Sequence, residues 1–166
     1  MFYRSKWIVA VAIVFDLVVF IPVVQAEQQN FDITFCGSIK TTETLLESQD
    51  LIITTFEGKG IVRSNLKDKT FDNWSYHLLG VRQEIPDKST AFGYSKYMDP
   101  DGDIVVQENL YPLGAKESTW KFLYGTGKWK GIKGSGKTAS VTRAKPITPG
   151  TRQGCLRSTG KFELPK

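Results

Sequence analysis

The chain has 166 residues, of which 40% are hydrophobic and 12% are aromatic. Its formal net charge is +5, and it contains two cysteines and no low-complexity tract, fixed-period repeat or linker. These features exclude a repeat protein and a chain divided by a linker, and they indicate one domain with a hydrophobic core.

Residues 1–26 have the layout of a secretory signal peptide. Two basic residues precede an apolar run over 7–24, and the small residues of VQA are followed by the polar EQQN. We therefore predict a signal helix that is cleaved after Ala26. The alternative is an uncleaved membrane anchor, which Asp16 disfavours by about 2.5–3.5 kcal/mol.

Residues 27–166 consist of short stretches of alternating hydrophobicity separated by turns. Aromatic and β-branched residues dominate these stretches, and the prolines fall between them, as strands require. Because about eight such stretches follow one another closely, we predict a single all-β domain, an antiparallel sandwich or barrel. For the stretch TTETLLESQ (41–49) we expect instead a turn or two of helix. The clearest alternation is in FDITFCGSIK (31–40), NWSYHLLGVRQ (73–83), TAFGYSKYM (90–98) and STWKFLYG (118–125).

Cys36 and Cys155 favour a closed barrel over a sandwich. An even pair in an exported chain predicts a disulfide, with two free buried thiols as the alternative. Cys36 lies on the polar face of the first predicted strand and Cys155 on the polar face of the last. The first and last strands become neighbours when a barrel closes, so two outward cysteines can then pair. We therefore predict an eight-stranded antiparallel β-barrel with a disulfide at its seam.

The stretch GIKGSGKT (131–138) fits the phosphate-loop pattern, but its context does not support a nucleotide site. A phosphate loop follows a parallel strand and opens a helix, whereas β-branched residues and a proline soon follow here. We therefore expect no bound nucleotide. Instead, we expect a short helical turn over 125–132 that plugs one end of the barrel with Trp129 and Ile132, followed by a strand.

The stretch GTGKWKGIKGSG (125–136) and the turn DPDGD (99–103) resemble segments of small eight-stranded barrels. These are the calycin-like and the allene-oxide-cyclase and dirigent-like barrels, which include many uncharacterised exported bacterial proteins. The resemblance implies an eight-stranded calycin-like barrel. Allene oxide cyclase isomerises a fatty-acid epoxide and dirigent proteins steer the radical coupling of phenols. No catalytic residue of either family matches a position here, so the resemblance implies no activity.

Two further motifs, a possible calcium loop and a lone histidine, do not indicate a metal site or a catalytic site. Counted from Asp99, the turn DPDGD lacks the glycine and the glutamate that an EF-hand needs at its sixth and twelfth positions. We therefore predict a hairpin turn there and no metal site. His77 is the only histidine, and no nucleophile or carboxylate is spaced to make it catalytic. We assign no catalytic residue and no cofactor.

Seven aromatic residues are the best candidates for a ligand site. They lie at alternating positions of three or four predicted strands, where they would either fill the barrel or line a small pocket. Tyrosine and tryptophan add polar groups that a buried site satisfies or uses. The candidates are Trp74, Tyr76, Phe92, Tyr94, Trp120, Phe122 and Tyr124.

Charge is distributed unevenly along the predicted domain. Residues 27–112 contain 8 Lys and Arg against 14 Asp and Glu, whereas residues 113–166 contain 12 against 2. The basic last third is either a patch for an anionic partner or the outer face of strands that the acidic first part complements. The wide spacing of the basic residues favours the second interpretation.

Together these features predict an exported, non-catalytic β-barrel, periplasmic or secreted, that binds a small apolar or aromatic ligand. One alternative is an isomerase or cyclase-like enzyme that uses the same pocket. Another is an envelope interaction protein that acts through its basic C-terminal third on an anionic surface. No nucleic-acid partner is expected.

Overall fold

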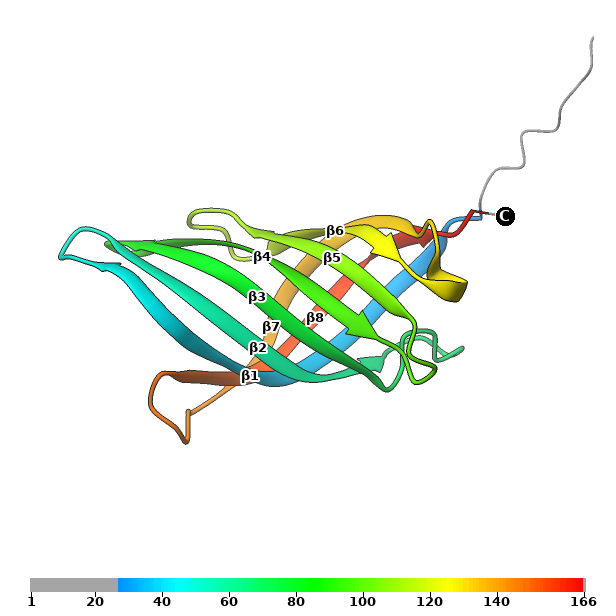
Figure 1. Cartoon of the computed structure of the whole chain (residues 1–166), viewed down its shortest axis with the longest axis horizontal. Coiled ribbons are helices and arrows are strands. Elements are labelled where there is room, and N and C mark those ends of the chain that lie inside the picture. Colours follow the sequence, from blue (N-terminus) through cyan, green and yellow to red (C-terminus); the bar gives the residue numbers. More distant parts are fainter. Residues whose placement is uncertain (1–26, 166) are drawn as a thin grey trace, which may run out of the picture.

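The computed structural model describes residues 27–165, which form eight β-strands and one short 3₁₀ helix (Figure 1). The strands are β1 (Gln29–Glu47), β2 (Ile52–Ser64), β3 (Trp74–Ile85), β4 (Lys88–Met98), β5 (Ile104–Tyr111), β6 (Ser118–Gly125), β7 (Lys133–Ala144) and β8 (Thr151–Glu163), and the helix is η1 (Gly127–Trp129). Within this part of the chain, no helix has the length and apolar character needed to cross a membrane. The predicted signal peptide and signal helix, residues 1–26, lie outside the described residues.

The eight strands form a closed antiparallel barrel. Each strand pairs with its neighbours in sequence, and β8 pairs with β1 to complete the cylinder. The prediction of an eight-stranded antiparallel barrel is thus confirmed. Along every strand, alternate side chains point into the barrel and out of it, so each strand contributes one inward set of residues.

The two ends of the barrel are built differently (Figure 1). One end, called here the closed end, has the loop 65–73, the turn 99–103 and η1. The other, the open end, has the connections that follow β1, β3, β5 and β7. At the open end, β1 projects beyond β8, because residues 41–47 pair with β2 alone.

The stretch 41–49 is not helical, which corrects the expectation from its sequence. Strand β1 continues to Glu47, which lies opposite Ile52, and two bulges interrupt the register on the way. A helix of one or two turns would leave most of its backbone groups without partners. Pairing with β2 satisfies those groups, and the several threonines of the stretch suit an extended backbone.

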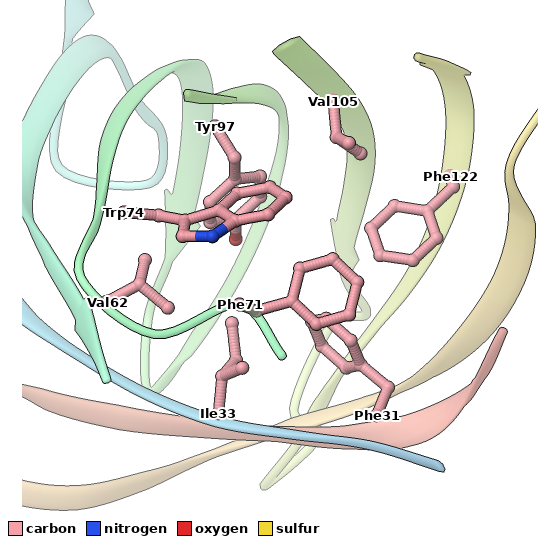
Figure 2. Close-up of a pocket in the computed structure, with 8 residues that line it drawn as sticks. All are labelled: Phe31, Ile33, Val62, Phe71, Trp74, Tyr97, Val105 and Phe122. Carbon is pink, nitrogen blue, oxygen red and sulfur yellow. The ribbon is translucent and has the colours of Figure 1, made fainter. Parts of the chain in front are cut away.

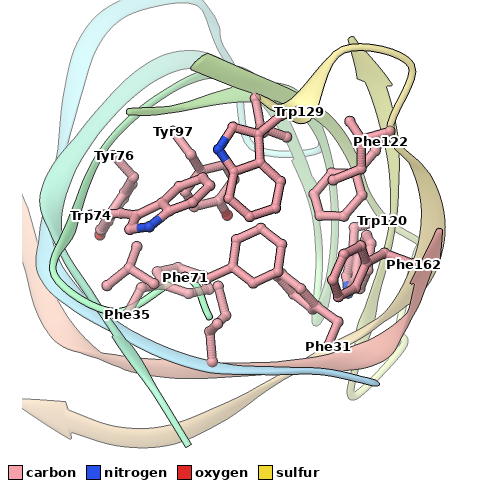
Figure 3. Close-up of a cluster of buried hydrophobic side chains, with 14 residues drawn as sticks. Phe31, Phe35, Phe71, Trp74, Tyr76, Tyr97, Trp120, Phe122, Trp129 and Phe162 are labelled. Atoms are coloured by element: carbon pink, nitrogen blue, oxygen red, sulfur yellow. The ribbon is translucent and has the colours of Figure 1, made fainter. Parts of the chain in front are cut away.

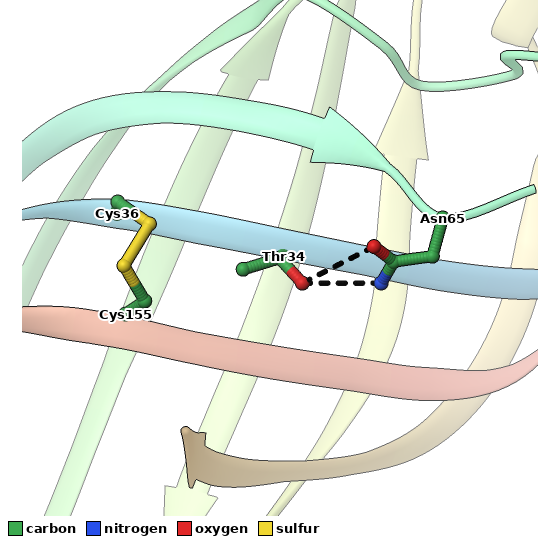
Figure 4. The surroundings of a disulfide bond; sticks show 4 residues. All are labelled: Thr34, Cys36, Asn65 and Cys155. Atoms are coloured by element: carbon green, nitrogen blue, oxygen red, sulfur yellow. Dashed lines mark hydrogen bonds between the residues drawn. A yellow bond between two sulfur atoms is a disulfide. The ribbon is translucent and has the colours of Figure 1, made fainter. Parts of the chain in front are cut away.

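A disulfide joins the two strands that close the barrel (Figure 4). Cys36 of β1 lies directly opposite Cys155 of β8, so the predicted pairing is confirmed. Nearby on the outer face, Asn65 Nδ2 donates to Asp32 Oδ1 at 2.8 Å and to Thr34 Oγ1 at 3.1 Å. The seam therefore combines backbone pairing, a covalent bond and side-chain hydrogen bonds.

Three pairs of glycines make room for aromatic rings inside the barrel. In each pair the two glycines face each other across neighbouring strands: Gly37 and Gly60, Gly80 and Gly93, Gly136 and Gly160. A Cβ atom on Gly136 or Gly160 would lie 2.7 Å from the ring of Trp120. A Cβ atom on Gly37 or Gly60 would collide with Tyr76, one on Gly80 with Phe56, and one on Gly93 with the backbone of Leu79. Each pair thus leaves the space that one ring occupies.

Acidic residues of the first part of the domain pair with four of the twelve basic residues of the last third. This agrees in part with the interpretation of a complemented outer face, and an anionic surface partner stays a prediction. The ion pairs are Arg157–Asp32 at 2.6 Å, Lys121–Glu108 at 2.8 Å, Lys128–Asp99 at 2.8 Å, Lys128–Asp101 at 2.6 Å and Arg152–Glu84 at 3.3 Å.

Replacing both cysteines by serine should lower the free energy of unfolding by about 2–5 kcal/mol. The bond spans a sequence separation of 119 residues, so it restricts the unfolded chain strongly. Urea denaturation of the oxidised protein and of the double variant measures the effect, with reduced wild-type protein as the control. Equal midpoints for oxidised protein and variant would contradict this role of the disulfide.

Gly136→Ala should lower the free energy of unfolding by about 1–3 kcal/mol, because the added methyl group would collide with Trp120 and with the paired strand. Gly58→Ala is the matched control, since its Cβ would meet the flexible Ile39 side chain at 3.1 Å and nothing closer. Thermal unfolding compares the two variants. If both melt at the same temperature, the glycine pair is not what admits the ring.

Candidate functional site

A cluster of buried aromatic side chains fills the closed end (Figure 3). The ring of Phe71 lies at its centre, with its centroid 4.9 Å from Phe31, 4.8 Å from Trp74 and 4.9 Å from Trp129. Trp129 and Ile132 are buried here, which confirms the predicted plug. We refer to seven aromatic residues of this cluster as the aromatic plug: Phe31, Phe71, Trp74, Trp120, Phe122, Trp129 and Phe162.

The aromatic plug leaves almost no free volume. The cavity enclosed within it measures about 10 Å³ (Figure 2). A space of that size holds at most one water molecule, so the closed end offers no room for a ligand. Its lining residues are Phe31, Ile33, Val62, Phe71, Trp74, Tyr97, Val105 and Phe122.

Asp99 fastens η1 to the closed end. Its side chain is 1% exposed and accepts a hydrogen bond from Trp129 Nε1 at 2.9 Å, and Lys128 Nζ lies 2.8 Å away. Its other oxygen accepts the backbone N–H groups of Asp101 and Asp103, which confirms the predicted hairpin turn. Burial alone would raise the pKa of this carboxyl, but the hydrogen bonds from Lys128 and Trp129 lower it to about 2.

The loop that carries Phe71 has an unusual backbone. Lys69, Phe71 and Asn73 have φ angles of 59°, 65° and 59°, a left-handed conformation that residues other than glycine seldom adopt. Asp72 supports this loop by accepting the N–H group of Ser64 at 2.8 Å. Burial of the Phe71 ring in the aromatic plug offsets the backbone strain.

The structure divides the seven aromatic candidates between the inside and the outside of the barrel. Four are buried inside: Trp74, Tyr76, Trp120 and Phe122. Three lie on the outer surface with 42%, 45% and 59% of their area exposed: Phe92, Tyr94 and Tyr124. The expectation that all seven face the interior is corrected for these three, and a ligand-binding role stays a prediction.

A β-bulge turns Tyr124 outward. Val106 of β5 pairs with Tyr124 but Gln107 pairs with Phe122, so Leu123 is an extra residue of β6. An extra residue reverses the alternation of side chains beyond it. The i, i+2, i+4 spacing of the sequence therefore does not keep Tyr124 on the side of Phe122.

Phe92 and Tyr94 form an apolar patch on the outer wall with residues of the neighbouring strands. Leu79 lies opposite Tyr94, while Val81 and Leu110 lie on either side of Phe92. All five side chains are at least 42% exposed. Strand β4 points Gly93, Ser95 and Tyr97 inward instead, so two of its three aromatic residues lie outside the barrel.

Between the aromatic plug and the open end, the inner wall is polar. Gln107 Nε2 donates to Asn109 Oδ1 at 2.6 Å, and Asn109 Nδ2 donates to Ser95 Oγ at 2.9 Å. Gln107 is 1% exposed, and its Oε1 has no hydrogen-bond partner among residues 27–165. Such a buried oxygen costs about 1–3 kcal/mol, so a water molecule or a ligand group is expected beside it.

Two buried tyrosines belong to the same wall. The rings of Tyr76 and Tyr97 are 6.2 Å apart. Burial raises the pKa of Tyr76 to about 12 and also raises the pKa of Tyr97. Both phenols therefore stay protonated at neutral pH and act as hydrogen-bond donors. We refer to these five residues of the inner wall as the polar belt: Tyr76, Ser95, Tyr97, Gln107 and Asn109.

At the open end, charged residues face one another across the barrel. Arg152 Nη2 lies 3.3 Å from Glu84 Oε1, and Arg82 Nη1 lies 3.5 Å from the same oxygen. The guanidinium of Arg82 also lies over the ring of Phe56, 5.3 Å from its centroid. Because β3 and β8 are not neighbours in the barrel, this mouth cluster of Arg82, Glu84 and Arg152 spans the opening.

Sequence reasoning missed both the polar belt and the mouth cluster. One signal was present, since the alternation that places Trp74 and Tyr76 inward continues along β3 to Arg82 and Glu84. No comparable signal indicated Gln107, because nothing local shows which face of β5 points inward.

Two other motifs have structural roles. Residues 133–138 of the phosphate-loop-like stretch are extended in β7, directly after η1, as predicted. His77 lies on the outer wall, with Nε2 2.7 Å from Glu57 Oε1. In the part of the chain that the structure covers, no group of three or more His, Cys, Asp and Glu residues is placed to hold a metal ion.

No family model matches the chain, and no curated protein matches it. Solved structures do match it. The pterocarpan synthase dirigent protein PsPTS1 has a TM-score of 0.61 and 9% identity, covering 86% of this chain and 99% of that one. The pterocarpan synthase dirigent protein GePTS1 has a TM-score of 0.52 and 10% identity, with 85% and 94% covered.

These similarities show a barrel fold shared with dirigent proteins, which confirms that part of the resemblance. At such low identity they show the fold alone. The calycin-like and bacterial parts of the resemblance stay predictions.

Asp99→Asn should lower the free energy of unfolding at pH 7 by about 1.5–3 kcal/mol, because Lys128 and Trp129 lose a charged acceptor. The folded pKa of about 2 lies below the ordinary value of 3.8. The carboxylate therefore stabilises the fold above pH 3.8, and this contribution disappears as the pH falls from 3.8 towards 2.

Denaturation at several pH values checks this prediction. The difference in free energy of unfolding between wild type and Asp99→Asn should become smaller as the pH falls below about 4. Asp101→Asn is the control, since its side chain is 76% exposed and its bond to Lys128 is worth little. A gap that is constant with pH would contradict the assigned role of the Asp99 carboxylate.

Proposed function

We propose that this chain is an exported, non-catalytic β-barrel that binds a small, mostly apolar or aromatic ligand at its open end. The observation that carries the proposal is the buried Gln107 Oε1, which has no partner among the described residues. Gln107 belongs to the polar belt and lies in register with Ser95 of β4 and with Phe122 of the aromatic plug. Ligand pockets combine apolar walls with a few such polar groups.

The inner wall at the open end offers apolar contacts beside the polar belt. Leu78 and Leu156 are partly buried and pack against the core, and Phe56 is 7% exposed. Leu78 lies in register with Ser95, and Ser95 with Gln107, so apolar and polar groups occupy adjacent inward positions of β3, β4 and β5. A ligand ring would lie against the leucines and donate a hydrogen bond to Gln107 Oε1.

Among the seven aromatic candidates, the proposal assigns ligand contact to Tyr76. Its phenol belongs to the polar belt and stays protonated, so it would donate a hydrogen bond. Trp74, Trp120 and Phe122 belong to the aromatic plug, where they support the site from below. The outer three residues are excluded, because they point away from the barrel interior.

The chemistry of the interior favours binding over an isomerase or cyclase. An isomerase or cyclase that works by proton transfer needs a proton acceptor beside its substrate, and protonated phenols are poor acceptors. His77 is on the outer wall, and the carboxylate of Glu84 is shared by two arginines. The two dirigent neighbours are named pterocarpan synthases, and their low identity gives no reason to transfer that activity.

Two observations support export. The Cys36–Cys155 bond requires an oxidising compartment to persist, such as the periplasm or the extracellular space. The predicted signal peptide over residues 1–26 would deliver the chain there. An envelope interaction through the basic last third is less favoured, because acidic residues of the first part already pair with four of its twelve basic residues.

Binding can be tested with the neutral fluorescent probe N-phenylnaphthylamine and two tryptophan variants. Leu78 points into the open end and Leu79 points outward with 52% exposure, so they form a matched pair. Leu78→Trp should block the site and weaken probe binding at least tenfold, whereas Leu79→Trp should leave it unchanged. Fluorescence titration of purified protein measures both affinities.

Loss of binding in Leu79→Trp alone would place the probe on the outer patch and overturn the proposal. Absence of probe binding to wild-type protein, together with no co-purified small molecule in a native mass spectrum, would also overturn it. Near-ultraviolet circular dichroism controls for folding of each variant.

A further inference from the structure

We propose that the mouth cluster binds an anionic group of the ligand, so that the ligand is an amphipathic small anion such as an aromatic carboxylate or sulfonate. The inference rests on the proposed function and adds the chemical class of the ligand. Its apolar part would enter the open end, while its charged group would stay at the mouth with Arg82 and Arg152.

The two arginines of the mouth cluster have N–H donors that their contacts with Glu84 do not use. Each guanidinium carries five N–H donors in a rigid fork that suits a carboxylate. Here both arginines approach a single oxygen, Glu84 Oε1, at 3.5 and 3.3 Å. These are long contacts for charge-assisted bonds, which normally measure about 2.7–2.9 Å. A second pair of acceptor oxygens can therefore join them.

The mouth carries an excess of positive charge. Burial lowers the pKa of Arg82, and the positive charges of Arg152 and Arg143 lower it further. Among the ion pairs of the described residues, Glu84 is the acidic partner of both Arg82 and Arg152. Two guanidiniums, from β3 and β8, thus share one carboxylate, with the positive charge of Arg143 of β7 nearby, and a negative ligand group would balance them.

The depth of Arg82 favours a small molecule over a macromolecular surface. Its side chain is 14% exposed and lies over Phe56 inside the barrel, whereas Arg152 is 65% exposed at the rim. A flat partner would reach Arg152 but not Arg82. A carboxylate or sulfonate on a small aromatic body can reach both.

Glu84 would compete with the ligand for the arginines. Removing its charge should therefore strengthen binding, and removing the charge of Arg152 should weaken it. Opposite effects of two substitutions in one ion pair are not expected from a general loss of structure. Arg152 is exposed, so Arg152→Gln should fold as wild type does.

The experiment compares two probes that differ in one group, anilinonaphthalene sulfonate and the neutral N-phenylnaphthylamine. We expect wild-type protein to bind the sulfonate at least tenfold more tightly. Arg152→Gln should weaken sulfonate binding about tenfold, and Glu84→Gln should strengthen it several-fold. Neither variant should change the affinity for the neutral probe.

Lys96→Gln is the matched control, since it removes one positive charge from the exposed outer face of β4. Equal affinity for the two probes, or an equal effect of Arg152→Gln on both, would overturn the anionic class while the proposed barrel site stands. Failure of both probes to bind would overturn the proposed function itself. If Lys96→Gln weakened sulfonate binding as much as Arg152→Gln does, the effect would come from net charge alone. The assignment of the anionic group to the mouth cluster would then be overturned.

Discussion

The limited volume inside eight strands is the constraint on which the rest of this structure depends. A barrel of eight strands has an interior only wide enough for side chains or one small ligand. This chain places large aromatic rings in that space, and three cross-strand glycine pairs make room for rings such as Trp120 and Tyr76. Because the rings meet at close range, the closed end has the density of an ordinary protein core.

The constraint divides the barrel into two parts with different roles. The aromatic plug, the Asp99 anchor of η1 and the disulfide at the seam supply stability at one end and along one side. The open end can then keep features that cost free energy. These are a buried oxygen without a partner on Gln107 and a mouth where arginines outnumber carboxylates. Such local costs are typical of binding sites that a rigid scaffold supports.

The barrel fold is shared with dirigent proteins at only 9% identity. Strand order and closure depend on backbone pairing more than on particular side chains, and a fold of this kind does not by itself fix a function. In this chain the inner wall beyond the aromatic plug combines a polar belt, partly buried leucines and a mouth cluster of both charges.

The local features could be predicted from the sequence. Alternation and turn residues predict the strands, the DPDGD hairpin and the turn that carries Trp129, because these depend on nearby backbone and side-chain preferences. For these features a residue and its immediate neighbours contain the physical reason. The even pair of cysteines on polar faces also predicted the seam, but that bond joins residues 119 positions apart and follows from closure of the barrel.

Which face of each strand points inward, and which residues meet across the barrel, depends on the tertiary structure. Phe92 and Tyr94 are outside because Gly93, between them, faces Gly80 across the strands, where no side chain would fit. A bulge, which no spacing reveals, sends Tyr124 outward. Arg152 and Glu84 meet although 68 residues separate them. Such contacts depend on how rings from all eight strands share one interior, which no single stretch of sequence specifies.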